Sequence, residues 1–167
     1  MLLLTENPME QVIKPIRIIA WGNRGRQDDG SALLLAERLS RRYACHGSDV
    51  IVQQYHQLGP ELVHDLDNCR LVIFVDAHVT QQGDVPMVEQ LVPAESGAAL
   101  DTHHCSPEWL LGLTAALGLF VPEAMMIGIP GHQWEFGDEL SEPTRRAIDR
   151  AEQFIEQIIA ERVDVAA

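Results

Sequence analysis

Three short polar segments carry the side chains that could do chemistry in this 167-residue chain. They are residues 22–30 (GNRGRQDDG), residues 76–78 (DAH) and residues 101–107 (DTHHCSP). Together they supply carboxylates and imidazoles, which are the oxygen and nitrogen ligands that first-row divalent metals accept. The three segments therefore predict a metal site with two carboxylates, one imidazole and an open position for a further group.

Each of these residues also has a simpler explanation when taken alone. Asp28 and Asp29 directly precede a predicted helix, where a carboxylate caps the helix or meets its dipole, but capping needs only one of the two. Asp76 could be a turn acid that bonds local backbone amides, and His103 and His104 could be ordinary loop residues. Their joint position is what favours a site.

Other kinds of catalytic or binding site are weakly supported. Residues 22–25 contain two glycines, but the sequence has neither a G-x-G-x-x-G pattern nor a phosphate-loop lysine, and it has no G-x-S-x-G nucleophile turn. Cys105 adjoins His104, and since sequence neighbours rarely face each other we expect a packed or inert thiol rather than a catalytic dyad. His56 and His132 also follow predicted strands, and we expect plain loop roles or outer support of a metal ligand.

The elements that would position these residues are read from hydrophobic periodicity. Short apolar runs predict strands, an apolar stripe with helical period predicts each long helix, and Ser106-Pro107-Glu108 predicts the start of another helix. Residues 85–92 are half polar and carry a proline, which is typical of an edge strand, and the sequence leaves open whether it is antiparallel to its neighbour. The predicted strands are 16–21, 49–55, 71–75, 85–92 and 125–129, and the predicted helices are 31–43, 59–67, 106–117 and a terminal helix from Ser141.

Strands that alternate with helices predict an α/β fold, in which a mostly parallel twisted sheet of about five strands lies between two layers of helices. The length suits a single domain, residues 1–167, with an irregular arm at 1–15. In such a sheet, ligands bind at the carboxyl ends of the strands. All three polar segments are expected at that edge.

Charge and composition narrow the choice of partners and location. The formal net charge is −13, from 25 acidic and 12 basic residues, so nucleic acid and anionic membrane are poor partners. The three cysteines form no C-x-x-C pair, and residues 1–5 lack the basic flank of a secretion signal. We expect a soluble protein of the reducing cytoplasm.

In chain order, the motifs GNRGRQDDG, VIFVDA, THHCSPEWLLGL and GIPGHQWEFGDELS resemble the nickel-iron hydrogenase maturation endopeptidases. The resemblance covers about residues 16–159. One segment departs from the pattern, because many members carry G-G-T-x-G after the second strand, where this chain has YHQLGP. The related form H-Q-L-x-P-E-L suggests a subtype.

This resemblance implies a site and a reaction. In the glycine-asparagine loop, residues 22–30, the second acid of the family motif corresponds to Asp29. The aspartate that ends the central strand in the family corresponds to Asp76. The spacing H-x-x-x-P-E-x-L-L selects His103 over His104. These three would be both the catalytic residues and the ligands of the metal, while Asp28 would be a cap or a supporting partner. The metal is nickel carried by the substrate, so the free protein would hold none tightly.

The implied activity is that of an aspartic-type endopeptidase, a hydrolase that activates a hydrogenase by removing a carboxyl-terminal peptide from its nickel-loaded large-subunit precursor. The alternative within the same fold is a module that binds precursor or metal without cleaving. A third reading, a flavin or nucleotide binder, lacks a phosphate loop. The sequence leaves open which hydrogenase is processed, where the cut falls and the oligomeric state. It also leaves open whether the three ligands activate the attacking water or only recognise the nickel-loaded precursor.

Overall fold

The fold of the chain is taken from a computed structural model that describes residues 14–44, 49–80, 82–95 and 105–164. A single sheet of five strands has the order β2-β1-β3-β5-β4, with β4 antiparallel to β5 and the other pairs parallel. The predicted α/β class is confirmed. The strands, in chain order, are β1 (Ile16–Trp21), β2 (Val50–Tyr55), β3 (Leu71–Val79), β4 (Met87–Leu91) and β5 (Glu123–Gly131).

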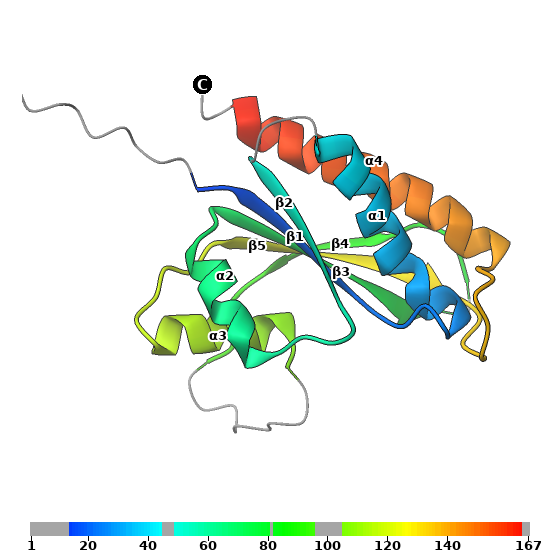
Figure 1. The fold of residues 1–167 in the computed structure, drawn as a ribbon, viewed down its shortest axis with the longest axis horizontal. Helices are drawn as coiled ribbons and strands as arrows, with labels where there is room; N and C mark the ends of the chain where they lie inside the picture. Colours follow the sequence, from blue (N-terminus) through cyan, green and yellow to red (C-terminus); the bar gives the residue numbers. More distant parts are fainter. Residues whose placement is uncertain (1–13, 45–48, 81, 96–104, 165–167) are drawn as a thin grey trace, which may run out of the picture.

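Helices cover both faces of the sheet (Figure 1). α1 (Ser31–Tyr43) and α4 (Glu142–Asp164) lie on one face, and α2 (Val63–Asp67) and α3 (Pro107–Ala116) on the other. Two short 3-10 turns, η1 (Gln27–Gly30) and η2 (Pro60–Leu62), lead directly into α1 and α2. The chain therefore forms the three layers that the sequence predicts.

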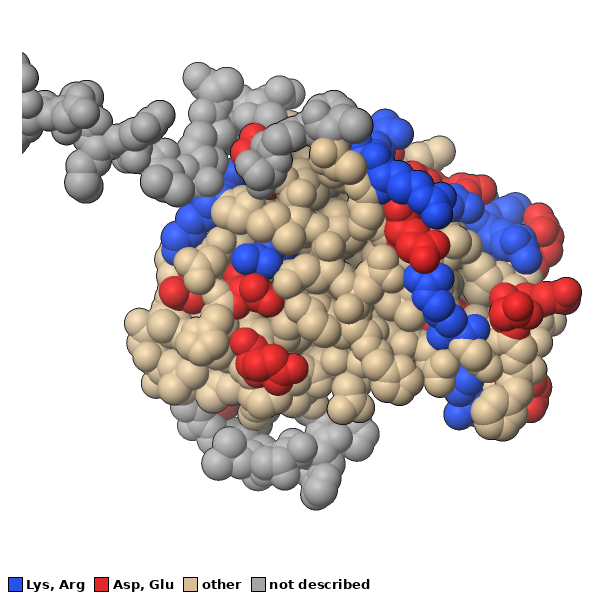
Figure 2. Space-filling view, in the orientation of Figure 1, with Lys and Arg blue, Asp and Glu red and all other residues tan. Residues whose placement is uncertain are grey.

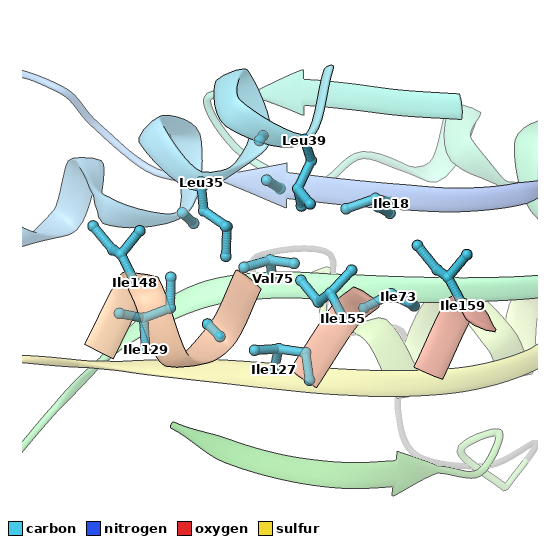
Figure 3. Close-up of a cluster of buried hydrophobic side chains, with 14 of the residues drawn as sticks. Ile18, Leu35, Leu39, Ile73, Val75, Ile127, Ile129, Ile148, Ile155 and Ile159 are labelled. Atoms are coloured by element: carbon cyan, nitrogen blue, oxygen red, sulfur yellow. The ribbon is translucent and has the colours of Figure 1, made fainter. Parts of the chain in front are cut away.

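Two hydrophobic clusters hold these layers together. The first lies between the sheet and α1 with α4, where aliphatic side chains such as Leu35, Val75 and Ile155 are fully buried (Figure 3). The second lies beneath α2 and α3 around Phe74 and Leu110. Successive residues of the central strand thus point into opposite clusters, because side chains alternate across a sheet. A strand buried on both faces explains the unbroken apolar run at residues 71–75.

The predicted elements are all present, but two strands are longer than expected. The sequence predicts β3 over residues 71–75 and β5 over 125–129, whereas they pair in register from Leu71↔Glu123 to Val79↔Gly131. Once β5 is alongside, the polar residues after Val75 continue the ladder. Asp76 therefore lies within a strand and does not end one.

Two predictions concern the chain outside this fold. The irregular arm at residues 1–15 lies almost wholly outside the described residues, and the division into one domain stays a prediction. Among the residues that the structure describes, no helix is long and apolar enough to cross a membrane.

Candidate active site

The loop between β1 and α1 folds back tightly and places Asp29 at the carboxyl edge of the sheet. Gly22 has φ +147°, and a Cβ there would overlap the carbonyl oxygen of Asp29, so only glycine fits. The amide of Asn23 donates to that same oxygen at 3.3 Å, and the amide of Asp29 donates to the carbonyl oxygen of Arg26 at 3.1 Å. These contacts fix the backbone on both sides of the half-buried Asp29 side chain.

Asp28, its neighbour, has a different role. It is fully buried, and its carboxylate accepts the backbone amides of His132 at 2.8 Å, Gln133 at 3.0 Å and Ser141 at 2.8 Å. The hydroxyls of Ser141 and Thr144 also donate to it, at 2.7 and 2.9 Å. Burial by itself would raise the pKa of Asp28, but the bonds from His132, Ser141 and Gln133 outweigh burial and lower it.

The expectation that Asp28 caps the helix that follows it is wrong. The residue at the amino-terminal cap of α1 is Gly30, and no side chain accepts a capping hydrogen bond there. Asp28 instead fastens the glycine-asparagine loop to the loop before α4. The structure agrees with the alternative role of Asp28 as a partner that supports Asp29. Its hydrogen bonds to the loop before α4 form a clamp that holds the backbone immediately before Asp29.

Asp76 lies on β3, next in the sheet to β1. Its carboxylate accepts the amide of Ala77 at 2.8 Å, which is the local bond that a purely structural acid would make. Burial, aided by the negative charge of Asp29, raises the pKa of Asp76 to about 7 against the opposing bond from Ala77. A half-buried carboxyl group whose ionisation a neighbouring acid opposes favours a cation between the two.

Trp21 is a member of this site that the sequence analysis missed. Its side chain donates a hydrogen bond to Asp76, and its ring packs edge-on against buried Phe74 with centroids 6.2 Å apart. Ala20 pairs with Val75 in register, which makes Trp21 and Asp76 neighbours across the two strands. The available signal was the position of Trp21 as the last residue of a strand that leads into the loop.

The structure therefore brings together two of the three predicted ligands, Asp29 and Asp76. The third, His103, and its alternative His104 lie outside the described residues. No cluster of three histidine, cysteine or acidic side chains suited to a metal occurs within the described ranges. The assignment of His103 thus stays a prediction.

An open cleft of about 840 Å³ extends from Asp76 across the sheet. Its floor comes from strands β1, β3, β5 and β4, and its wall from the segment around η2 and the start of α3. Three further acids line it, namely Glu61, Glu89 and Glu108, and no lysine or arginine of the described residues does so. Figure 2 shows a group of positive side chains over α1 on one side of the molecule and a smaller group on the other side. Arg17 pairs with Asp65 of α2 at 3.1 Å, so α2 has a basic residue beside it that does not line the cleft.

Three histidines near the carboxyl edge of the sheet differ in exposure and in their contacts. His56 is exposed beside the turn of the first loop, as a plain loop residue would be. The imidazole of His132 lies 2.9 Å from the carbonyl oxygen of Gly83, and its amide bonds Asp28. Within the described ranges, the buried Nδ1 of His78 has no hydrogen-bond partner, and burial together with His132 lowers the pKa of His78. None of the three is shown to support a ligand.

The two cysteines that the structure describes are poor nucleophiles. Burial raises the pKa of Cys69 to about 12, and burial together with the charge of Glu61 raises that of Cys105. The expectation of a packed, inert thiol at Cys105 agrees with this, although its side chain does line the cleft.

The fold is one that solved hydrogenase maturation proteases share. The hydrogenase maturating endopeptidase HybD from E. coli superposes with a TM-score of 0.68 at 21% identity, covering 89% of this chain and 93% of that one. The [NiFe] hydrogenase maturation protease HybD from Thermococcus kodakarensis gives 0.65 at 20% identity, with 86% and 98% covered.

HycI, a further [NiFe] hydrogenase maturation protease from Thermococcus kodakarensis KOD1, gives a TM-score of 0.63 at 22% identity, with 90% and 95% covered. No model of a protein family matches the sequence, and no curated protein matches it. At these identities the structural likeness establishes the fold.

We predict that the free protein binds divalent nickel only weakly. Asp29 and Asp76 leave the coordination shell open, and with the pKa of Asp76 at about 7 a metal must compete with a proton at neutral pH. Titration calorimetry with nickel chloride measures this affinity. Stoichiometric metal retained through purification without added nickel would contradict the prediction.

Proposed function

We propose that this protein is an endopeptidase that removes a carboxyl-terminal peptide from the nickel-loaded large-subunit precursor of a nickel-iron hydrogenase. The observation that carries the proposal is that Asp29 and Asp76 lie near each other at the carboxyl edge of the sheet. The fold that contains this sheet is the one that solved hydrogenase maturation proteases share. These are the two acids that the sequence motifs select.

The site would act on nickel that belongs to the substrate. Asp29, Asp76 and His103 would bind the metal already inserted in the precursor, and so position the scissile peptide against the cleft. Two chemical routes to hydrolysis are open to this arrangement. The metal lowers the pKa of a bound water, or one of the carboxylates takes the proton of the attacking water as general base. Asp76 suits the second route because its pKa of about 7 lies near the working pH.

The cleft supports a macromolecular substrate. It is open to solvent, and it joins apolar side chains such as Trp21, Met126 and Leu91 to carboxylates. A peptide segment fits such a surface. The proposed partner is thus the precursor protein itself, and the proposed location is the cytoplasm, where such a precursor would be assembled.

The test is incubation of the purified protein with nickel-loaded and with nickel-free precursor, followed by gel mobility and mass spectrometry of the product. Cleavage of the loaded form alone is the expected result. If neither form is cut while both bind, the protein is a binding module, and the peptidase proposal is wrong. A bound flavin spectrum in the purified protein would also contradict it.

The paired histidines provide a second prediction. His103→Ala should abolish processing and His104→Ala should leave most of it, because His103 has the motif's spacing to Pro107 and Leu111 and adjacent loop residues usually point apart. Initial rates on the nickel-loaded precursor measure both variants. Equal loss in the two would show that the assigned register is wrong.

A further inference from the structure

The outer edge of the sheet at β4 is unusually apolar. Among the residues that the structure describes, eight large hydrophobic side chains are exposed, and four of them lie at residues 85–92. They are Val85 at 63%, Met87 at 42%, Val88 at 44% and Val92 at 70% exposure. Edge strands in soluble proteins are normally protected by charge, bulges or cover, so an open apolar edge marks an interaction surface.

β4 also has backbone groups available for pairing. It is the last strand in the order β2-β1-β3-β5-β4 and pairs with β5 along one side only. On its other side, alternate amide and carbonyl groups have no strand partner within the described residues. A strand of another molecule could hydrogen-bond to this edge and extend the sheet.

The edge is continuous with the candidate active site. Met87, Glu89 and Leu91 alternate along β4, and all three line the cleft that contains Asp76. Val88 faces the opposite side of the sheet, since neighbouring residues of a strand alternate. A strand added beside β4 would therefore place every second side chain at the rim of the cleft.

We propose that β4 is the docking strand for an extended segment of the precursor, which pairs with its free edge and puts a positively charged side chain at the cleft. This inference rests on the proposed function and adds how the substrate is held. The occupant's chemistry follows from the surface. Exposed valines and Met87 favour apolar residues, and Glu89, Glu61 and Glu108 favour a cation in a cleft without lysine or arginine among its described lining.

The first experiment tests strand pairing directly. Fluorescent peptides with the carboxyl-terminal sequence of the precursor are made with one N-methylated amide at a time, and their affinity for the full chain is measured by anisotropy. In an added strand only alternate amides bond the neighbour. Affinity should therefore fall by about fivefold or more at every second position and stay unchanged between them. A flat profile, or no binding by the unmodified peptide, overturns the proposal.

The second experiment uses variants of the edge. Val88→Lys places a charge where natural edge strands carry one, and its partly exposed side chain should let the fold survive. It should raise the KM for nickel-loaded precursor by at least about fivefold, with kcat nearly unchanged. Leu117→Lys, at a similarly exposed site just after α3, is the matched control and should keep the wild-type KM. An unchanged KM in Val88→Lys overturns the proposal.

The charge of the docked segment is tested by a swap. Glu89→Lys should weaken binding of a peptide that carries lysine or arginine, and replacing that residue by glutamate in the peptide should restore it. Failure of the swap in both directions overturns the charge assignment. A wild-type protein that is dimeric, with a monomeric Val88→Lys variant, would show that the edge pairs with a second copy and would overturn docking of the precursor there.

These outcomes separate the two proposals. If the wild-type protein cleaves no precursor, the proposed function fails. If it cleaves precursor but Val88→Lys and the N-methylated peptides behave as their controls, only strand docking fails.

Discussion

Asp29→Asn and Asp76→Asn are each expected to reduce processing of the nickel-loaded precursor by more than roughly 100-fold, since changing groups that merely orient a ligand already costs about 10- to 100-fold. The fold should survive both changes. The side-chain oxygen introduced by Asp76→Asn would still accept the hydrogen bond from the amide of Ala77. Burial penalises the charged form of Asp76, so a neutral side chain removes that penalty from the folded state.

The measurement pairs initial processing rates with thermal unfolding of each variant at pH 8. The sign for Asp76 is fixed by its raised pKa: above pH 7 its ionised form destabilises the folded state, so Asp76→Asn should melt no lower than the wild type. Glu135→Gln, an exposed acid in the loop after β5, is the matched control. Normal processing by both variants would remove the basis of the mechanism, and unfolding of both would make the acids structural.

The sequence predicts the sheet well because local patterns decide it. The largely apolar runs at 16–21 and 71–75 predict buried strands, and residues 85–92, which contain β4, read as an edge strand because of Pro86 and their half-polar composition. The carboxyl ends of β3 and β5 escaped prediction because residues 76–79 become strand only by pairing with residues 128–131, and residues 130–131 only by pairing with residues 78–79. That pairing joins segments far apart along the chain and leaves no local signal.

The contrast between local patterns and long-range contacts also explains why the role of Asp29 could be predicted and that of Asp28 could not. Asp29 is recognised from its motif, and the position of Asp76 at the end of an apolar run predicts where the two meet. The partners of Asp28 lie 104 to 116 residues away along the chain, so spacing near Asp28 suggests only a cap. Trp21 was missed for a related reason, because its bond to Asp76 depends on which strands are neighbours.

Asp28→Asn is expected to destabilise the protein, contrary to the mild effect that a helix cap would show. Asparagine keeps one acceptor oxygen but turns an NH₂ group toward amides and hydroxyls that already donate. An unsatisfied buried group costs about 1 to 3 kcal/mol, and a protein of this size loses roughly 2–4 °C of melting temperature per kcal/mol. We expect the melting temperature of Asp28→Asn to fall by about 5 °C or more, and that of Asp28→Ala to fall further. Processing of the precursor should also slow, because Asp29 directly follows Asp28.

This loss should depend on pH in a defined direction. The pKa of Asp28 in the folded state lies below its ordinary value of 3.8, so the unfolded chain takes up a proton first as the pH falls. The stabilisation by its ionised form is complete well above pH 3.8 and is lost as the pH falls through the lower, folded-state pKa. The gap between wild type and Asp28→Asn should accordingly be full at pH 7 and narrow below about pH 3.8.

Urea unfolding at pH 7 and pH 3 measures this gap, with Asp138→Asn as the control because that acid is exposed in the loop to which Asp28 is bonded. The two sites differ in burial and in the number of donors they face, while the chemical change is the same. A full-sized effect at Asp28 with none at Asp138 assigns the loss to the buried carboxylate. Equal stability of Asp28→Asn and the wild type at pH 7 would mean that the loop before α4 does not depend on this clamp, and that Asp29 is positioned by its own backbone contacts to Asn23 and Arg26.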